Sequence, residues 1–372
     1  MAQEGGVGVT PAPASPSTAA PDLNIGGEPL PAIEQRGLVT SSPGRLIGIL
    51  VCLVVLVLLA MLSIAVGTRT MAIDAVLHAF ADFDPTNNDH IVVQSLRVPR
   101  TLLGIEVGLA LGLAGAVIQG VVRNPLADPG ILGVSAGASL SVVLAIYFLG
   151  ISSLIGYVWF GFAGAALAAV LVYAVGSIGA GGATPVKLTL AGAAMSAFFA
   201  SIATAIMLVD LSTLDQFRFW VVGSLSGRDM SVVVQVAPFI LIGAVMALAS
   251  GRLLNALALG DDLARSLGQK VGRSRMFAAL AVVLLVGGAT AAAGPIAFVG
   301  LIVPHVARAF TGPDYRWVLP YSAVLAAILL LGCDVLGRVI GRPGEVQASV
   351  VAALIGVPFF IALVRRRKLA EL

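Results

Sequence analysis

Long apolar runs recur along most of this chain and restrict what it can fold into. A helix needs about 20 predominantly apolar residues to cross a bilayer. The composition agrees with a membrane protein, because 58% of the residues are hydrophobic and 11% are charged, against about a quarter charged in typical soluble domains. We predict an all-α polytopic membrane protein with about ten transmembrane helices packed as one domain. The runs are residues 46–66, 101–121, 131–149, 157–178, 188–209, 232–250, 276–293, 296–310, 317–335 and 346–364.

The chain divides into a tail and a transmembrane domain. Residues 1–45 are rich in Pro, Ala, Ser and Gly and show no apolar period, which is typical of a disordered tail. They contain neither the basic start nor the apolar core of a signal peptide. Residues 46–368 form the predicted transmembrane domain, and residues 369–372 form a short C-terminal tail. The run at 296–310 is short and contains Pro304, so the sequence does not fix its ends.

The distribution of Lys and Arg predicts the orientation, because cytoplasmic loops carry an excess of both. With ten spans and a cytoplasmic N-terminus, 15 of the 22 basic residues fall inside. An odd number of spans would place the basic residues 365–368 outside. Both termini are therefore predicted to be cytoplasmic. The basic residues left outside are Arg69, Arg97, Arg100, Arg218, Arg228, Arg338 and Arg342.

A polar segment with two prolines separates the second and third apolar runs. Pro125 and Pro129 each remove a backbone donor and restrict the residue before them, so the chain must turn within residues 123–137. Broken backbone at membrane depth is tolerated where protein covers it or where it lines a watery cavity, which indicates a translocation path. We expect the side chains of Asn124 and Asp128 to fix the turn by bonding to backbone groups. The candidate path residues are Asn124, Pro125, Leu126, Asp128, Pro129, Gly130 and Ser135.

The longest inner loop contains a second informative segment, residues 259–268. Acidic residues in the first turn and a glycine at the end predict a short helix, with Leu259, Leu263 and Leu267 on one stripe. A short amphipathic helix on the cytoplasmic face suits the docking of a soluble partner. The chain has no G-x-x-x-x-G-K-[ST] phosphate loop, so an ATPase that drives it would be another polypeptide. The candidate docking residues are Leu259, Gly260, Asp261, Asp262, Leu263, Ala264, Arg265, Leu267 and Gly268.

The second span contains an acidic residue and closely spaced glycines. Glu106 lies about two turns into this span, where a carboxylate is costly and indicates a functional site. It could line an outer cavity, or it could be protonated and bonded within the bundle. Gly108 and Gly112 have the spacing that lets helix backbones approach closely in lipid. Cys52 and Cys333 lie in apolar runs as small hydrophobic residues, so no disulfide and no metal site is predicted.

Four separated segments, taken together and in this order, resemble one family. They are residues 97–100 (Arg-Val-Pro-Arg), 123–137, 259–268 and 294–305. They are similar to the FecCD-type permease subunits of iron-siderophore and vitamin B12 importers, which are type II ABC importers, over about residues 45–368. The resemblance implies a non-catalytic permease that pairs with a second permease, two cytoplasmic ATPase subunits and an extracytoplasmic binding protein. ATP and magnesium would be used by the ATPase, and neither a cofactor nor nucleic acid would bind this chain.

The resemblance also implies residue roles. Residues 259–268 match the coupling helix, which sits in a cleft of the ATPase, and residues 124–129 match the cytoplasmic gate region. Arg97 and Arg100 match by motif, and Arg338 by position, the arginines that meet acidic residues of the binding protein. The expected cargo is a ferric siderophore, moved across the cytoplasmic membrane of a bacterium by alternating access.

Haem or cobalamin are alternative cargoes. A secondary transporter and an intramembrane enzyme are more distant alternatives. Residues 133–137 fit the G-x-S-x-G pattern of a serine nucleophile, but no strand is predicted before them and no Asp and His partners are evident.

Overall fold

The computed structural model describes residues 37–39, 41–67, 71, 73–151, 153–179 and 184–370. Within these ranges the regular secondary structure is helical, as predicted. Most of the predicted tail, residues 1–36 and 40, lies outside the described residues, as do residues 371–372. The first helix begins at Ser42 rather than residue 46, because the Ser41 side chain accepts a hydrogen bond from the Gly44 amide at 3.3 Å and Pro43 fits a first turn.

The helices correspond to the predicted spans. Among the described residues, seven are long and apolar enough to cross a membrane and three more are shorter apolar helices. The seven long helices are α1 (Ser42–Ala65), α4 (Val98–Val122), α6 (Leu154–Gly176), α7 (Pro185–Val209), α9 (Met230–Ala249), α12 (Val271–Ala293) and α14 (Tyr315–Ile340). The three helices with shorter apolar stretches are α5 (Val134–Leu149), α13 (Val299–Thr311) and α15 (Ala348–Ala370).

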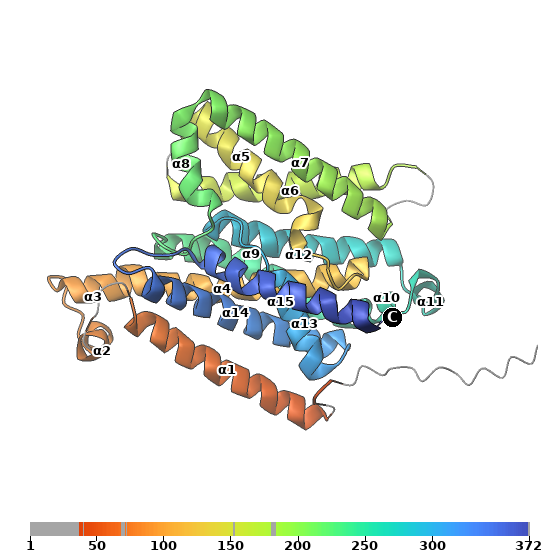
Figure 1. Ribbon diagram of the computed structural model, residues 1–372, viewed down its shortest axis with the longest axis horizontal. Coiled ribbons are helices and arrows are strands. Elements are labelled where there is room, and N and C mark those ends of the chain that lie inside the picture. The colour runs from red at the N-terminus through yellow and green to blue at the C-terminus, as the bar shows by residue number, and fades with distance from the viewer. Residues whose placement is uncertain are drawn as a thin grey trace, which may run out of the picture. The chain divides into compact units, whose positions relative to one another are not determined.

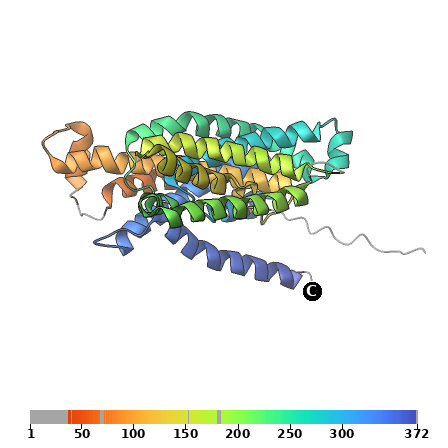
Figure 2. The ribbon, with the colours of Figure 1, turned by 90° about the horizontal axis from the view of Figure 1, so that it is seen from above.

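Short helices lie at both ends of this bundle. At one end, here called the α3 end, lie α2 (Ile73–Ala81), α3 (Asn88–Val92), the π-helical turn η1 (Val93–Arg97) and α8 (Leu211–Val221); at the other, the α11 end, lie α10 (Gly251–Ala258) and α11 (Asp261–Ser266) (Figure 1). The C-terminal end of α15 also lies at the α11 end, and α15 runs along one edge of the bundle (Figure 2). The start of α1 lies there too, where the Leu38 amide donates to the Ala309 carbonyl at 3.0 Å.

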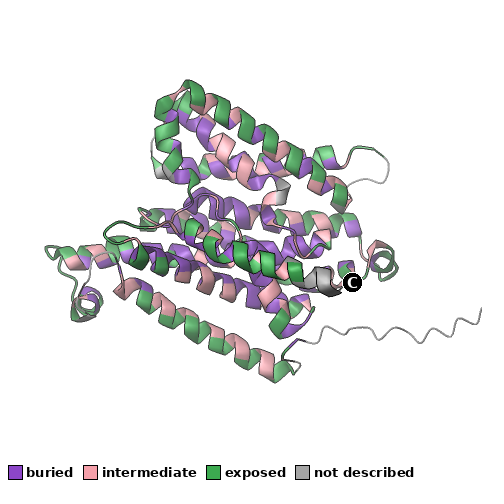
Figure 3. Ribbon diagram, viewed as in Figure 1, coloured by how far each residue is buried: buried purple, intermediate pink, exposed green. Residues whose placement is uncertain are grey.

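Helix α4 is largely buried among α12, α13 and α14, whereas α1 and α7 are mostly exposed (Figure 3). Its glycines allow close backbone contact. A Cβ at Gly112 would collide with the Ser322 carbonyl of α14, and one at Gly115 would collide with the Gly300 carbonyl of α13. The close approach predicted from the glycine spacing is therefore confirmed, and α4 contacts two neighbours through its backbone.

Two breaks shift helix boundaries relative to the sequence prediction. After α4, the chain turns and forms the 3-10 helix η2 (Pro129–Leu132), so α5 begins at Val134 rather than residue 131. Before α13, Gly294 and Phe298 have φ of +76° and +69°, which ends helical geometry and delays the start of α13 to Val299. The turn within residues 123–137 is confirmed.

Candidate functional site

Three arginines and two carboxylates come together at the α3 end, and we call them the arginine cluster: Arg97, Arg100, Arg338, Asp334 and Glu345. Arg97 ends η1, Arg100 lies in the first turn of α4, and Asp334 and Arg338 are one turn apart on α14. Glu345 belongs to the segment that joins α14 to α15. The three arginines and Glu345 line one cavity of about 250 Å³. The structure therefore brings together the three arginines that the sequence singled out.

Arg100 is bonded on several sides. Its Nε lies 3.1 and 3.0 Å from the two Asp334 carboxylate oxygens, and its Nη2 lies 2.8 Å from Asp334 Oδ1. Its Nη1 donates to Glu345 Oε2 at 2.8 Å and to Ser226 Oγ at 3.4 Å. Asp334 also pairs with Arg338 Nη2 at 3.0 Å and is 1% exposed. One buried carboxylate thus balances two guanidinium groups through charge-assisted hydrogen bonds.

Arg97 and Arg338 bind the C-terminal end of α1. Arg97 Nη1 donates to the carbonyl oxygens of Ile64 at 2.8 Å and Ala65 at 2.7 Å. Arg338 Nη1 donates to the Ser63 carbonyl at 2.8 Å, and its Nη2 donates to the Ser63 hydroxyl at 2.7 Å. The last carbonyls of a helix lack intrahelical donors and attract cations. The two arginines therefore cap α1 and join it to α4 and α14.

Burial distinguishes this cluster from a set of free surface arginines. Arg97, Arg100 and Arg338 are 6%, 8% and 2% exposed. Their predicted contact with a binding protein stays a prediction, but their visible contacts lie within the chain. Sequence reasoning missed Asp334 and Glu345. Asp334 carried a signal, since it is a carboxylate inside an apolar run, whereas Glu345 lies in a polar loop and carried none.

At the α11 end, the predicted helix 259–268 is shorter than expected. Gly260 has φ of +107°, which separates α10 from α11, so α11 begins at Asp261. Gly268 has φ of +82°, the left-handed conformation predicted for it. The break divides the predicted stripe, because Leu259 follows α10, Leu263 lies in α11 and Leu267 follows α11. All three leucines are exposed, by 59%, 57% and 66%. An exposed apolar stripe on a short helix is a suitable contact for a partner protein.

Asp261 ties α11 to two membrane helices. Its Oδ1 accepts hydrogen bonds from Arg123 Nη2 at 2.6 Å and from Arg275 Nη2 at 3.0 Å. Arg123 follows α4 with φ of +54°, and Arg275 lies in the first turns of α12. The structure therefore links the two informative segments of the sequence through one carboxylate. Arg275 was missed as a site residue, because nothing in the sequence indicates which cation reaches Asp261.

The turn after α4 is fixed by its own side chains, as predicted. Asn124 Oδ1 accepts a hydrogen bond from the Leu126 amide at 2.9 Å, and Asp128 Oδ1 accepts one from the Gly130 amide at 2.7 Å. Burial raises the pKa of Asp128, and the Gly130 hydrogen bond acts in the opposite direction. Pro129 lies against Gly300 of α13.

Of the other path candidates, Pro125, Leu126 and Ser135 are half-buried. The path role of the whole set stays a prediction.

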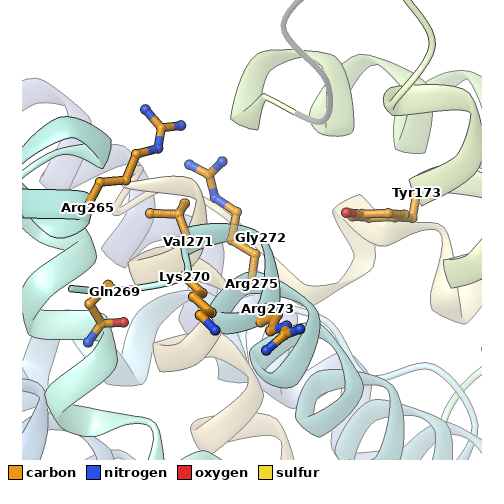
Figure 4. Close-up of a pocket in the computed structure, with 8 residues that line it drawn as sticks. All are labelled: Tyr173, Arg265, Gln269, Lys270, Val271, Gly272, Arg273 and Arg275. Carbon is orange, nitrogen blue, oxygen red and sulfur yellow. The ribbon is translucent and has the colours of Figure 1, made fainter.

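A basic cavity of about 520 Å³ lies beside α11. Four cationic side chains line it, with Tyr173 of α6 on the opposite side (Figure 4). The exposed Asp262 pairs with one of them, Arg265, at 2.9 Å. The α11 end therefore presents positive charge next to the exposed leucine stripe. The cations are Arg265, Lys270, Arg273 and Arg275.

Glu106 faces a cavity of about 570 Å³ between α4 and α9. The other lining residues are apolar, among them Leu109 and Ile240. Glu106 Oε2 is buried and has no hydrogen-bond partner among the described residues. The structure places Glu106 at a cavity, and its functional role stays a prediction. Within the described part of the chain, no group of three or more His, Cys, Asp or Glu could hold a metal ion.

Two named bacterial permeases are similar to this chain over most of its length. The "Probable siderophore transport system permease protein YfiZ" of Bacillus subtilis is 44% identical over 319 residues, 86% of this chain and 96% of the relative. The "Ferric enterobactin transport system permease protein FepD" of Escherichia coli is 44% identical over 315 residues, 85% of this chain and 94% of the relative.

A solved structure of an inward-facing metal-chelate type ABC transporter matches with a TM-score of 0.76 and 28% identity, covering 87% of this chain and 99% of that chain. The profile of the FecCD transport family matches residues 54–366. This multi-pass membrane protein therefore belongs to the FecCD transport family.

Proposed function

We propose that this chain is the membrane-spanning permease subunit of an ATP-driven importer that carries ferric siderophores into a bacterial cell. Two relatives with 44% identity are named as siderophore and ferric enterobactin permeases. The observation that carries the mechanism is the link at Asp261, which joins the exposed helix α11 to the turn after α4 and to α12.

The link gives a route from an ATPase to the translocation path. The ATPase contacts α11 and the residues that flank it through the exposed side chains of Leu259, Leu263 and Leu267. When ATP binding closes the ATPase, α11 is displaced, and Asp261 carries the displacement to Arg123 and Arg275. Arg123 begins the turn that holds the proposed gate residues, so the turn and α12 move with α11. No bond of the cargo is made or broken, and ATP and magnesium are bound by the ATPase.

The proposed orientation puts the α11 end in the cytoplasm and the α3 end outside. The described chain begins and ends at the α11 end (Figure 1), which agrees with an even number of spans. The excess of Lys and Arg on the inner loops favours the same direction. The ATPase subunits then meet α11, and a substrate-binding protein docks at the α3 end, where the arginine cluster lies. A second permease, identical or different, completes the path.

Replacing the leucine stripe tests the coupling. The triple variant Leu259→Ala, Leu263→Ala, Leu267→Ala should lose most ATPase association in pull-down from detergent. It should also lose ATP-dependent uptake of radioiron siderophore in proteoliposomes. A matched control replaces three leucines of similar exposure on α6, α7 and α9 by alanine, and it should behave like the wild type. These are Leu167, Leu190 and Leu241, exposed by 59%, 66% and 65%.

Three results would contradict the proposal. If the triple variant keeps both ATPase association and uptake, the coupling role of α11 is wrong. If uptake proceeds without the ATPase and follows an ion gradient, the chain is a secondary transporter. If haem or cobalamin is accumulated and ferric siderophores are not, the cargo assignment is wrong.

A further inference from the structure

We propose that Glu345 holds, in the undocked permease, the place on Arg100 that a carboxylate of the binding protein takes on docking. This inference rests on the proposed docking of a binding protein at the α3 end. It assigns different tasks to the three arginines of the cluster, because their contacts differ in how easily they can be exchanged.

Arg97 and Arg338 are committed to the backbone of α1. Each donates to carbonyl oxygens of the last turn of that helix at 2.7–2.8 Å. Turning either guanidinium toward a partner would leave buried carbonyls without donors, which is costly. Asp334 is equally fixed, since it is 1% exposed and bonds two arginines. These groups serve the folded chain and are poorly placed for exchange.

Arg100 Nη1 is different, because its main partner is accessible. The Glu345 side chain is 30% exposed, and the other hydrogen bond of Arg100 Nη1 among the described residues is a long one, to Ser226 Oγ at 3.4 Å. Arg100 and Glu345 line the same cavity of about 250 Å³. Gly227 also lines this cavity, and a Cβ built on it would meet no atom within 4 Å. A side chain from outside therefore has space beside the pair.

Charge balance favours an exchange of like groups. Around the cavity, Asp334 and Glu345 oppose the three arginines, and Asp89 acts on Arg97. Removing Glu345 from Arg100 without replacement would leave a buried guanidinium with one carboxylate fewer, and a buried charge that loses its partner is costly. An Asp or Glu side chain from the binding protein restores the number of carboxylates that pair with Arg100. Glu345 thus keeps a second carboxylate on Arg100 until a partner carboxylate arrives.

Neutralising Glu345 tests the exchange. The assay measures the Kd between the permease complex in nanodiscs and its purified substrate-binding protein, at two salt concentrations. In the wild type, docking breaks one ion pair and forms another, whereas in Glu345→Gln it only forms one. Because docking on Glu345→Gln breaks no ion pair, this variant should bind about tenfold more tightly, a gain of about 1.4 kcal/mol, and with a stronger salt dependence. Glu345→Asp, which keeps a carboxylate, should stay closer to the wild type.

The matched control removes a different carboxylate at the same end. Asp215 on α8 is 65% exposed and pairs with Arg218 at 3.1 Å, away from Arg100. Asp215→Asn changes the net charge by the same amount, so it reports the general electrostatic effect on an acidic partner. If the Kd of Glu345→Gln equals that of Asp215→Asn, or is larger than that of the wild type, the proposed exchange is wrong.

A second variant separates this inference from the docking itself. The double variant Arg100→Gln, Asp334→Asn removes a buried charge pair together, which is tolerated better than removing one partner. If it weakens the binding protein's affinity while Glu345→Gln does not strengthen it, docking at Arg100 holds and only the exchange is wrong. If the double variant leaves the affinity unchanged, docking at Arg100 is wrong, and the exchange falls with it.

Discussion

The two ends of the bundle use charged residues in opposite ways. At the α3 end, three arginines are buried and join α1, α4 and α14 through Asp334 and the carbonyls of α1. At the α11 end, Leu259, Leu263 and Leu267 are exposed, and the ion pairs of α11 lie at the surface or half-buried. The comparison teaches that burial, rather than the number of charges, separates the end that holds helices together from the end that we propose contacts the ATPase.

Removing Asp334 should have the largest effect on stability. Asp334→Asn leaves Arg100 and Arg338 without their shared carboxylate, and breaking a buried pair in this way costs about 3–5 kcal/mol. SDS-induced unfolding in mixed micelles would measure the free energy of unfolding. The double variant Arg100→Gln, Asp334→Asn should recover part of the loss. If Asp334→Asn is as stable as the wild type, the α3 end does not depend on its buried charges and the comparison fails.

Removing Asp261 should have an intermediate effect. Asp261→Asn weakens the bonds to Arg123 and Arg275, whose side chains are 34% and 11% exposed, and we expect a loss of about 1–2 kcal/mol in the same unfolding assay. Asp262→Asn is the control on the same helix. Its carboxylate is 99% exposed and, among the described residues, pairs with the exposed Arg265, so its effect should stay below about 0.5 kcal/mol. Equal effects of the two variants would contradict the role of Asp261 as the link.

The smallest effect concerns acid stability at the α11 end. Burial tends to raise the pKa of Asp314, but hydrogen bonds from Arg316 and Asn255 outweigh it and lower the pKa from 3.8 to about 2. A carboxyl whose pKa is lower in the folded than in the unfolded state stabilises the protein at pH values above the unfolded-state pKa. This stabilisation is lost as the pH falls through the folded-state pKa. The difference in thermal midpoint between wild type and Asp314→Asn should therefore shrink between about pH 4 and pH 2. A constant difference across this range would contradict the assignment.

Much of the fold could be predicted because a membrane span is indicated by the composition of one continuous segment. The apolar runs fixed the crossing helices, and Pro125 and Pro129 fixed the turn. The short helices α2 and α8 were missed, because nine and eleven residues are too few to form an apolar span. The breaks at Gly260 and Phe298 depend on positive φ, which a single sequence does not reveal.

The arginines of the arginine cluster were predictable, but their carboxylate partners and the bonds between them were not. Arg97, Arg100 and Arg338 were found from motif and position, yet their bonds join residues more than 200 positions apart, such as Arg100 and Asp334. Such pairings are set by the packing of α4 on α14 and leave no local pattern. The hydrogen bonds of Asn124 and Asp128 to backbone groups of the turn were predicted, because each of them joins residues only two positions apart.

The glycine contacts of α4 determine which helices can shift in a working cycle. Where Gly112 meets the Ser322 carbonyl and Gly115 meets the Gly300 carbonyl, no side chain lies between the chains to rotate out of the way. Sliding α4 along either neighbour would bring a residue that carries a Cβ against a backbone carbonyl. We therefore expect α4, α13 and α14 to move as one rigid unit, so that an opening to either side of the membrane comes from tilting this unit or from moving the helices around it.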